Sequence, residues 1–459
     1  MTHQFNPTIL REYDVRGIVG DTLTEADAYA LGRTYAAVAR GEGAKRIAVG
    51  RDGRTHSRDL EAELIRGLTD GGLDVVMVGM GPSPMLYFAT YHLDVDGGIQ
   101  VTGSHNPADY NGFKLLLNGR SVFGEEIQAI GRRAAAGDWS EGSGSVVEAD
   151  VRDAYVDRLL EGFSGLRFRI GWDAGNGAAG PILDMLVERL PGHHRVIYSE
   201  VDGSFPNHHP DPTVEANLAD LKQLVASDEL DFGIAFDGDG DRIGAVDGEG
   251  RVIWGDQLLM ILAEPVLKEQ PGATIIADVK ASQALFDRVA ELGGTPLMWK
   301  TGHSLIKSKM KETGAPLAGE MSGHIFFKHR WYGFDDALYA AIRLIEAVSQ
   351  SGRSLTQIMD AMPKTTATPE MRFQVDESRK FAVVDEVRDR LFADGAQVDA
   401  TDGVRVSTGD GWWLLRASNT QDVLVARAEA KDDAGVARLM AQIDDQLARS
   451  GVKRVEAAH

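Results

Sequence analysis

A serine stands in a short polar segment, Thr102–Pro107, immediately after the apolar run Gly98–Val101. Such a run predicts a buried strand, and the strand would carry Ser104 into a loop at its end. Asn106 followed by Pro107 predicts a helix cap with proline at the first helical position, which would turn free backbone N–H groups toward the serine. Because such groups favour an anion, Ser104 is a candidate carrier of a phosphoryl group.

Three aspartates alternate with glycines in a second loop, where Asp237, Asp239 and Asp241 lie between two apolar runs. Carboxylates at this density predict a site for Mg²⁺ or Ca²⁺, because they repel one another without a cation. The spacing excludes a calcium-binding EF-hand, since the sixth position is Arg242 instead of glycine and the twelfth is Gly248 instead of glutamate. We therefore expect three carboxylate ligands with an open coordination position that an oxygen of a phosphorylated serine would fill.

A third polar loop, Gly319–His324, offers Glu320 and Ser322 between glycines, a pair suited to binding two neighbouring sugar hydroxyls. His324 and His303 are candidates for proton transfer near neutral pH.

A fourth segment, Arg416–Thr420, has the composition of an anion clamp. The guanidinium of Arg416 is joined there by the hydroxyls of Ser418 and Thr420 and the amide of Asn419. We expect a second phosphate site in this segment.

The composition limits what these residues could act on. A net charge of −21 argues against a nucleic-acid partner, so an anionic substrate would need cations gathered in one place. The chain has no cysteine, which excludes thiolate catalysis and disulfides. It shows no membrane-spanning run and no secretion signal at its start, so we expect a cytoplasmic protein without a membrane partner.

The elements that position these loops follow a repeated strand–helix–strand pattern. The 459 residues are too many for one core, and the pattern predicts three diverged copies of one α/β unit followed by a smaller α+β domain with an antiparallel sheet. We expect an α/β protein of three similar mixed domains and a fourth α+β domain around a central cleft, because strand ends carry ligands in such sheets. The expected domains are 1–150, 151–254, 255–364 and 365–459.

With four motifs in this order, the chain resembles the α-D-phosphohexomutase family over essentially its whole length. Segment Thr102–Pro107 resembles the family's phosphoserine loop and Asp237–Arg242 its magnesium loop. Gly319–His324 resembles its sugar-binding loop and Arg416–Thr420 its phosphate-binding loop.

The resemblance implies a mutase that moves phosphate between the 1- and 6-oxygens of a hexose through a phosphoserine and a bound hexose 1,6-bisphosphate. Mg²⁺ is the implied cofactor, the bisphosphate the activator, and free sugar phosphates of mannose or glucose the partners. The implied metal ligands are Ser104, Asp237, Asp239 and Asp241. The implied catalytic residues are Ser104, Lys114, His324 and Arg16. The implied substrate-binding residues are Tyr13, Arg16, Arg242, Lys280, His303, Glu320, Ser322, His324, Arg416, Ser418, Asn419 and Thr420.

Several alternatives stay open at this point. Lys114 and His324 are both candidates for the general base, and the lysine would need a lowered pKa to act near neutral pH. Gly103 stands where many relatives have alanine, a change expected to loosen the backbone without removing a functional atom. Met321 favours the mannose/glucose branch over the glucose-specific one. A phosphoglucosamine mutase and a catalytically silent sugar-phosphate-binding protein are the rival predictions, and a monomer is favoured.

Overall fold

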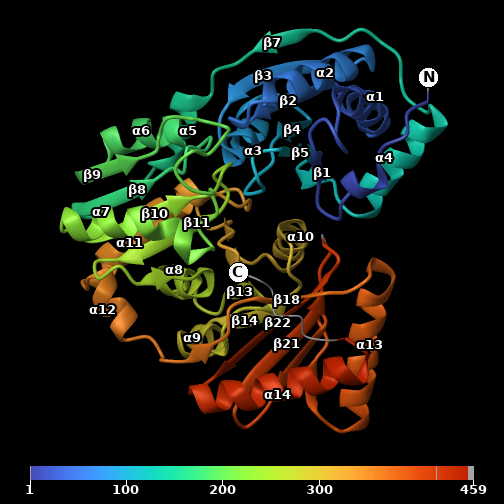
Figure 1. Cartoon of the computed structure of the whole chain (residues 1–459). Helices are drawn as coiled ribbons and strands as arrows, with labels where there is room; N and C mark the ends of the chain where they lie inside the picture. The colour runs from blue at the N-terminus through green and yellow to red at the C-terminus, as the bar shows by residue number, and fades with distance from the viewer. Residues whose placement is uncertain (1, 420, 453–459) are drawn as a thin grey trace.

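The computed structural model describes residues 2–419 and 421–452, which form four domains that follow one another in an arc from the blue first domain to the red fourth (Figure 1). Within these residues, no helix is both long and apolar enough to cross a membrane.

The first domain is built on a seven-stranded sheet with the order β1-β5-β4-β2-β3-β7, and β6 pairs with β5. Its elements are η1 (Pro7–Ile9), β1 (Val15–Ile18), α1 (Glu25–Gly41), β2 (Arg46–Arg51), α2 (Ser57–Asp70), β3 (Asp74–Met80), α3 (Ser83–His92), β4 (Gly97–Val101), β5 (Tyr110–Leu117), β6 (Arg120–Ser121), α4 (Glu125–Ala136) and β7 (Val146–Glu148). Helix α1 begins where Thr24 and Asp27 form a reciprocal capping box, which satisfies two N–H groups at the helix start.

The second and third domains have smaller sheets, with the orders β12-β11-β10-β8-β9 and β14-β13-β15-β16. The second contains α5 (Arg152–Leu159), β8 (Phe168–Asp173), α6 (Gly180–Arg189), β9 (Gly192–Ile197), η2 (Glu215–Leu218), α7 (Ala219–Ser227), β10 (Phe232–Phe236), β11 (Ile243–Asp247) and β12 (Val252–Ile253). The third contains α8 (Gly255–Glu269), β13 (Thr274–Asp278), α9 (Gln283–Glu291), β14 (Thr295–Trp299), α10 (His303–Thr313), β15 (Leu317–Gly319), β16 (Ile325–Phe327), α11 (Ala337–Ser351) and α12 (Leu355–Asp360).

One unit of four strands recurs in all three sheets. Three strands run parallel and the fourth antiparallel, in the groups β3-β2-β4-β5, β9-β8-β10-β11 and β14-β13-β15-β16. The predicted serine, aspartate and sugar loops each connect the third strand of a unit to its fourth. The prediction of three diverged copies is therefore confirmed, and it explains why the three loops occupy equivalent places.

The fourth domain has a six-stranded antiparallel sheet with the order β17-β22-β21-β20-β19, and β18 also pairs with β22. Its elements are β17 (Thr366–Ala367), β18 (Met371–Gln374), α13 (Glu377–Ala393), β19 (Gln397–Asp399), β20 (Val404–Ser407), β21 (Gly411–Ala417), β22 (Val423–Ala430) and α14 (Asp433–Arg449). Helices α13 and α14 pack on the sheet, as Figure 1 shows, and the expected α+β domain is confirmed.

One local prediction is wrong. Asn106 does not cap a helix and Pro107 does not begin one, because the chain after Ser104 forms turns and enters strand β5 at Tyr110. The backbone carbonyls of this segment are bound by the side chain of Arg54, which lies about fifty positions away, so the sequence of the segment itself does not reveal it.

Candidate functional site

Three buried carboxylates form the centre of the site. Asp237, Asp239 and Asp241 lie in the loop between β10 and β11, each is fully buried, and a carboxylate oxygen from each lies within 4.8 Å of the others. Burial raises the pKa of Asp237 well above its ordinary value, and the neighbouring carboxylates raise it further. Solvent cannot screen these three carboxyl groups from one another, so their fully ionised form needs a neighbouring cation.

The donor set of this centre fits a hard cation such as Mg²⁺. One oxygen of Asp239 and one of Asp241 are buried and have no hydrogen-bond partner among the described residues. Oxygen atoms that are buried, anionic and unpartnered are the ligands that Mg²⁺ binds. The remaining oxygens face Lys114 on β5, whose Nζ lies 2.6 Å from Asp239 Oδ2 and also pairs with Asp241.

Ser104 is brought to the edge of this carboxylate centre. Its Oγ lies 3.2 Å from Asp237 Oδ2 and 3.2 Å from Nδ1 of His105. Its backbone φ is +50°, a conformation that non-glycine residues adopt mainly where the surrounding structure imposes it, and often at functional sites. Burial lowers the pKa of His105 well below its ordinary value, so a neutral imidazole lies beside the serine hydroxyl.

The serine loop is held by two residues that the sequence did not single out. Arg54 donates hydrogen bonds to the carbonyls of Ser104, Asn106, Pro107 and Tyr110 at 2.5 to 3.0 Å. Asp52 accepts hydrogen bonds from the Thr102 hydroxyl and the Gly103 N–H. Their signal in the sequence was weak: both follow strand β2 in a polar loop at the same edge of the sheet.

Gly103 has a steric role that the sequence did not predict. A Cβ atom at this position would lie 2.4 Å from Arg54 Nε and 2.8 Å from the Tyr110 carbonyl oxygen. The glycine therefore does more than loosen the backbone before Ser104, because it makes room for the arginine that holds the loop.

Arg16 lies on β1 beside the serine loop. Its guanidinium donates to Asn106 Oδ1 at 2.6 Å and to the Gly103 carbonyl at 3.2 Å, and it pairs with Asp14. The structure thus places Arg16, a predicted catalytic and substrate-binding residue, against the serine loop with Asp14 as its counter-ion.

The second and third domains meet at the aspartate loop and the sugar loop. Arg242 forms an antiparallel bridge with His324, and the Ile243 N–H donates to the Gly323 carbonyl at 3.0 Å. A side chain at Gly323, whose φ is +86°, would lie 2.6 Å from the Ile243 carbonyl oxygen, so this approach requires glycine. The ring of His303 stacks on that of His324 with their centroids 5.7 Å apart.

Glu320 and Ser322 occupy the loop between β15 and β16. Glu320 is buried, and its Oε1 accepts a hydrogen bond from the Gly302 N–H at 2.7 Å. Ser322 is half-buried two positions later. Asp278, which the sequence did not single out, fixes this loop by accepting from the Met321 N–H and the Thr301 hydroxyl.

The anion clamp reaches the other domains through hydrogen bonds. Asn419 donates to the Tyr13 hydroxyl at 2.7 Å, which joins the fourth domain to the first, and Tyr13 donates to the Thr301 carbonyl at 2.9 Å. Arg416 pairs with Asp402 at 2.9 Å. Ser418 is buried beside them, and Thr420 lies outside the described residues.

Lys280 adds a cation at the junction of the third and fourth domains. Its Nζ lies 3.2 Å from Glu370 and 3.9 Å from Asp278, and the side chain is largely buried. The described residues predicted for catalysis and binding thus lie in two connected groups, one around Ser104 and the aspartates and one around Glu320, Tyr13 and Asn419.

Comparisons with known families match the four domains in order. The models described as phosphoglucomutase/phosphomannomutase alpha/beta/alpha domains I, II and III match residues 7–141, 153–250 and 254–366, and the model of the C-terminal domain matches residues 370–446. The chain therefore belongs to the phosphoglucomutase/phosphomannomutase family, within the α-D-phosphohexomutases, and the resemblance seen in the sequence is confirmed.

Particular relatives cover nearly the whole chain. A phosphomannomutase/phosphoglucomutase of Pseudomonas aeruginosa is 46% identical over 96% of this chain and 95% of its own length. A phosphoglucomutase of Neisseria gonorrhoeae is 44% identical over 94% of this chain and 95% of its own length. A crystal structure of a phosphoglucomutase/phosphomannomutase family protein from Burkholderia thailandensis superposes with a TM-score of 0.92 at 42% identity, covering 100% of this chain and 99% of that one.

Proposed function

We propose that this chain is a phosphohexomutase that interconverts hexose 1-phosphate and hexose 6-phosphate of mannose, glucose or both. The observation that carries the proposal is the position of Ser104, whose Oγ lies 3.2 Å from Oδ2 of Asp237, one of three buried and neighbouring carboxylates. Relatives that are 44–46% identical over nearly the whole chain and are named for this activity support it.

The first half of the reaction transfers phosphate from the serine to the sugar. The bond between phosphorus and Ser104 Oγ breaks, a bond between phosphorus and a sugar hydroxyl oxygen forms, and the hydroxyl proton passes to a general base. Arg16, Arg242 and Lys114 supply positive charge around the transferring group, which stabilises the charge that develops on its oxygens. The product of this half is a hexose 1,6-bisphosphate.

The second half returns the opposite phosphate to Ser104 after the bisphosphate turns around. Glu320 and Ser322 hold sugar hydroxyls in either orientation, while Arg416, Ser418, Asn419 and Thr420 anchor the phosphate that does not react. We assign three further residues to the binding of the substrate: Tyr13, Lys280 and His303. The second half of the reaction phosphorylates Ser104 at the expense of the bisphosphate. Free hexose 1,6-bisphosphate would therefore activate enzyme whose Ser104 has lost its phosphate.

We assign Asp237, Asp239 and Asp241, with an oxygen of phosphorylated Ser104, as the ligands of Mg²⁺. When bound, the ion would withdraw charge from the phosphoryl oxygens and favour departure of the serine oxygen.

Intact-mass measurement tests the carrier directly. The purified chain should show a one-phosphate increment that Ser104→Ala abolishes together with mutase activity, while Ser227→Ala, a change at an exposed serine, should leave both unchanged. Mutase activity that survives Ser104→Ala would overturn the proposal.

A substrate panel decides the sugar. We expect turnover of mannose 1-phosphate and glucose 1-phosphate with Mg²⁺ and a trace of hexose 1,6-bisphosphate. Dominant turnover of glucosamine 1-phosphate would instead identify a phosphoglucosamine mutase, and binding without turnover would identify a silent sugar-phosphate-binding protein.

We further propose that the boundaries of the domains lie at residues 150, 254 and 364, and that the fourth domain hinges near 363–370 to retain the turning bisphosphate. Small-angle scattering should show compaction on addition of substrate, and an unchanged radius of gyration would contradict the hinge.

We place the enzyme in the cytoplasm as a monomer. Sedimentation analysis would test the monomeric state.

A further inference from the structure

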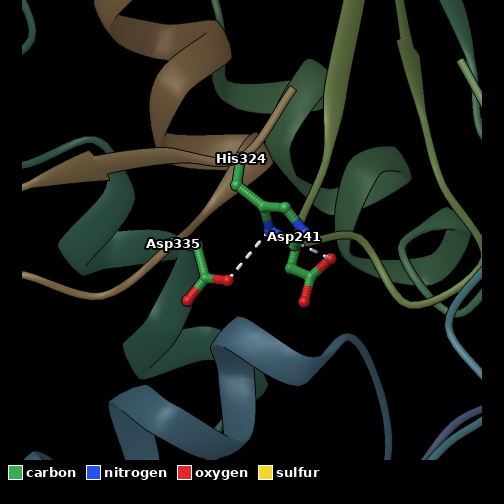
Figure 2. A group of neighbouring side chains, drawn as sticks. All are labelled: Asp241, His324 and Asp335. Atoms are coloured by element: carbon green, nitrogen blue, oxygen red, sulfur yellow. Dashed lines mark ion pairs between the residues drawn. The ribbon is translucent and has the colours of Figure 1, made fainter. Parts of the chain in front are cut away.

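A second buried cluster adjoins the aspartate loop. Asp241, His324 and Asp335 come from three different segments, and Figure 2 shows the His324 ring with ion pairs to both carboxylates. One ligand atom from each lies within 4.8 Å of the others, an arrangement that would also suit a metal ion. The hydrogen bonds of the histidine decide between these possibilities.

Arg242 determines where the histidine carries its hydrogen. The Nε of Arg242 always bears a hydrogen and donates it to Nε2 of His324 at 3.0 Å. A neutral imidazole has one acceptor nitrogen and one N–H, so Nδ1 must carry the hydrogen when Nε2 accepts. A protonated Nδ1 cannot bind a metal, and the cluster is therefore not a second metal centre in this arrangement.

The hydrogen on Nδ1 faces Asp335 more closely than Asp241. Nδ1 lies 3.0 Å from Asp335 Oδ2 and 3.7 Å from Asp241 Oδ1. Both Nδ1 and Asp335 Oδ2 are buried, and within the part of the chain that the structure describes their 3.0 Å ion pair is the contact that can satisfy them, since neither has a hydrogen-bond partner. Asp335 is thus the natural acceptor for this hydrogen.

Asp335 is held firmly enough to orient a neighbour. It is fully buried, and its backbone forms an antiparallel bridge with Phe326 just before helix α11. Its second carboxylate oxygen lies 3.1 Å from Nζ of Lys307 on α10. The lysine fixes one oxygen of the carboxylate and leaves the other for the histidine.

We propose that Asp335 is a positioning residue for phosphoryl transfer, because it fixes His324 in the Nδ1–H tautomer. Nε2 is then the acceptor atom of the ring, and its single lone pair holds the Arg242 guanidinium or, in place of that hydrogen bond, receives the proton of the sugar hydroxyl. This inference rests on the proposed function, in which His324 and Arg242 face the transferring phosphoryl group. The choice between Lys114 and His324 as general base does not alter this inference, since a histidine that only holds Arg242 needs the same tautomer.

The tautomer can be observed directly by NMR of the full chain with ¹⁵N-labelled histidine, using His324→Gln to assign the signal. We expect the Nδ1–H form in the wild-type protein and its loss in Asp335→Asn, whose amide can donate to Nδ1. The kcat should fall by roughly 10²- to 10⁴-fold with little change in KM, because a wrongly protonated ring no longer accepts from Arg242.

Two variants separate positioning from general stability. Asp336→Asn changes the adjacent buried carboxylate, which accepts from Tyr155 and the Tyr339 N–H and does not contact His324, and should keep the tautomer and kcat. Lys307→Met removes the cation that binds the second oxygen of Asp335 and should also keep the tautomer.

An Nε2–H form of His324 in the wild-type protein would overturn the proposal, even if Asp335→Asn failed to fold. Equal losses of kcat in Asp335→Asn and Asp336→Asn would overturn it as well. Because the NMR result does not depend on turnover, its failure is distinguishable from absence of mutase activity, which would count against the proposed function instead.

Discussion

The first three domains share a hydrophobic core, whereas the fourth domain contacts the third mainly through polar groups. A continuous apolar core runs through the first three, from Tyr87 on α3 through Tyr155 and Trp172 to Phe334 before α11. Aromatic rings dominate the contact between the first and third domains, where Tyr91 stacks on Tyr332 with centroids 4.6 Å apart. Burial of this kind stabilises a fixed relative placement.

The fourth domain has its own core and meets the third mainly through polar contacts. A small apolar cluster of Val279, Trp412 and Leu414 is the hydrophobic part of this junction. Around it, Arg405 donates to the Val279 and Ala281 carbonyls at 2.7 Å. Further bonds join Ser282 to Glu429 and Lys280 to Glu370.

This difference between the two kinds of junction agrees with the function that we propose for each set of loops. The serine, aspartate and sugar loops belong to the three domains that share a core, so the reacting groups keep a fixed geometry. The predicted phosphate clamp belongs to the domain with the smaller and more polar junction, which suits the hinge that we propose for it. Four changes test this contrast, from the largest expected effect to the smallest.

Phe334→Ala should cost about 3–5 kcal/mol of unfolding free energy, because it removes a buried ring packed between the first and third domains. Denaturant unfolding measures the loss. Phe392→Ala, at a side chain 52% exposed on α13, should change the stability by no more than about 0.5 kcal/mol. Equal losses of unfolding free energy in the two variants would contradict the importance of the core shared by the first three domains.

Asp336→Asn should abolish a pH dependence of stability at the contact between the second and third domains. Burial raises the pKa of Asp336 to about 7 from an ordinary 3.8, so the unfolded chain loses this proton more readily than the folded one. The wild-type protein should therefore lose stability as the pH rises from about 4 to about 7, by at most about 4 kcal/mol.

The free energy of unfolding of the wild-type protein and of Asp336→Asn is measured at pH 5 and at pH 8. Relative to the wild-type protein, the variant should be more stable at pH 8 than at pH 5. Asp385→Asn, at an exposed carboxylate of the fourth domain, should show no such shift. A pH-independent difference for Asp336→Asn would contradict the raised pKa.

Arg405→Met should weaken the junction of the third and fourth domains by about 1–3 kcal/mol, because it leaves two buried carbonyls without their donor. Domain-resolved hydrogen exchange should show faster exchange in the fourth domain and unchanged protection in the first three. Arg388→Met, at a surface arginine of α13, is the matched control. Faster exchange in all four domains would show that the fourth domain does not open independently of the other three.

Glu370→Gln should have the smallest effect, about 0.2–1 kcal/mol, because Glu370 is about one-third exposed in its pair with Lys280. Lys280 lowers the pKa of Glu370 to about 2, so the pair is charged throughout the neutral range. The effect should shrink as salt is added, as measured by the midpoint of thermal unfolding in a salt series. A salt-independent loss would indicate a packing role instead.

Elements with strong local patterns were predictable from the sequence. Strand β4 at Gly97–Val101 contains the apolar run before Ser104, and strands β10 at Phe232–Phe236 and β11 at Ile243–Asp247 are the two apolar runs around the aspartate loop. An apolar run between polar loops forms a strand whatever surrounds it, so neighbours in the chain suffice. The aspartate loop was equally clear, because three carboxylates so close together need a cation.

The predictions failed where distant side chains override local preference. Asn106 and Pro107 have the composition of a helix start, but Arg54 binds the carbonyls of that segment and β5 follows at once. Gly103 seemed a neutral change until the position of Arg54 gave it a steric reason. Asp335 has no motif around it, and its contact with His324 exists only in the folded chain.

The sequence by itself determined the repeated strand pattern, the four loops and the residue types that each loop offers, because these depend on periodicity and on neighbours in the chain. Only the tertiary structure decided which groups meet. Lys114 reaches Asp239 across 125 positions and Asn419 reaches Tyr13 across 406. Such contacts follow from how sheets and domains pack, and packing depends on side chains far apart in the sequence.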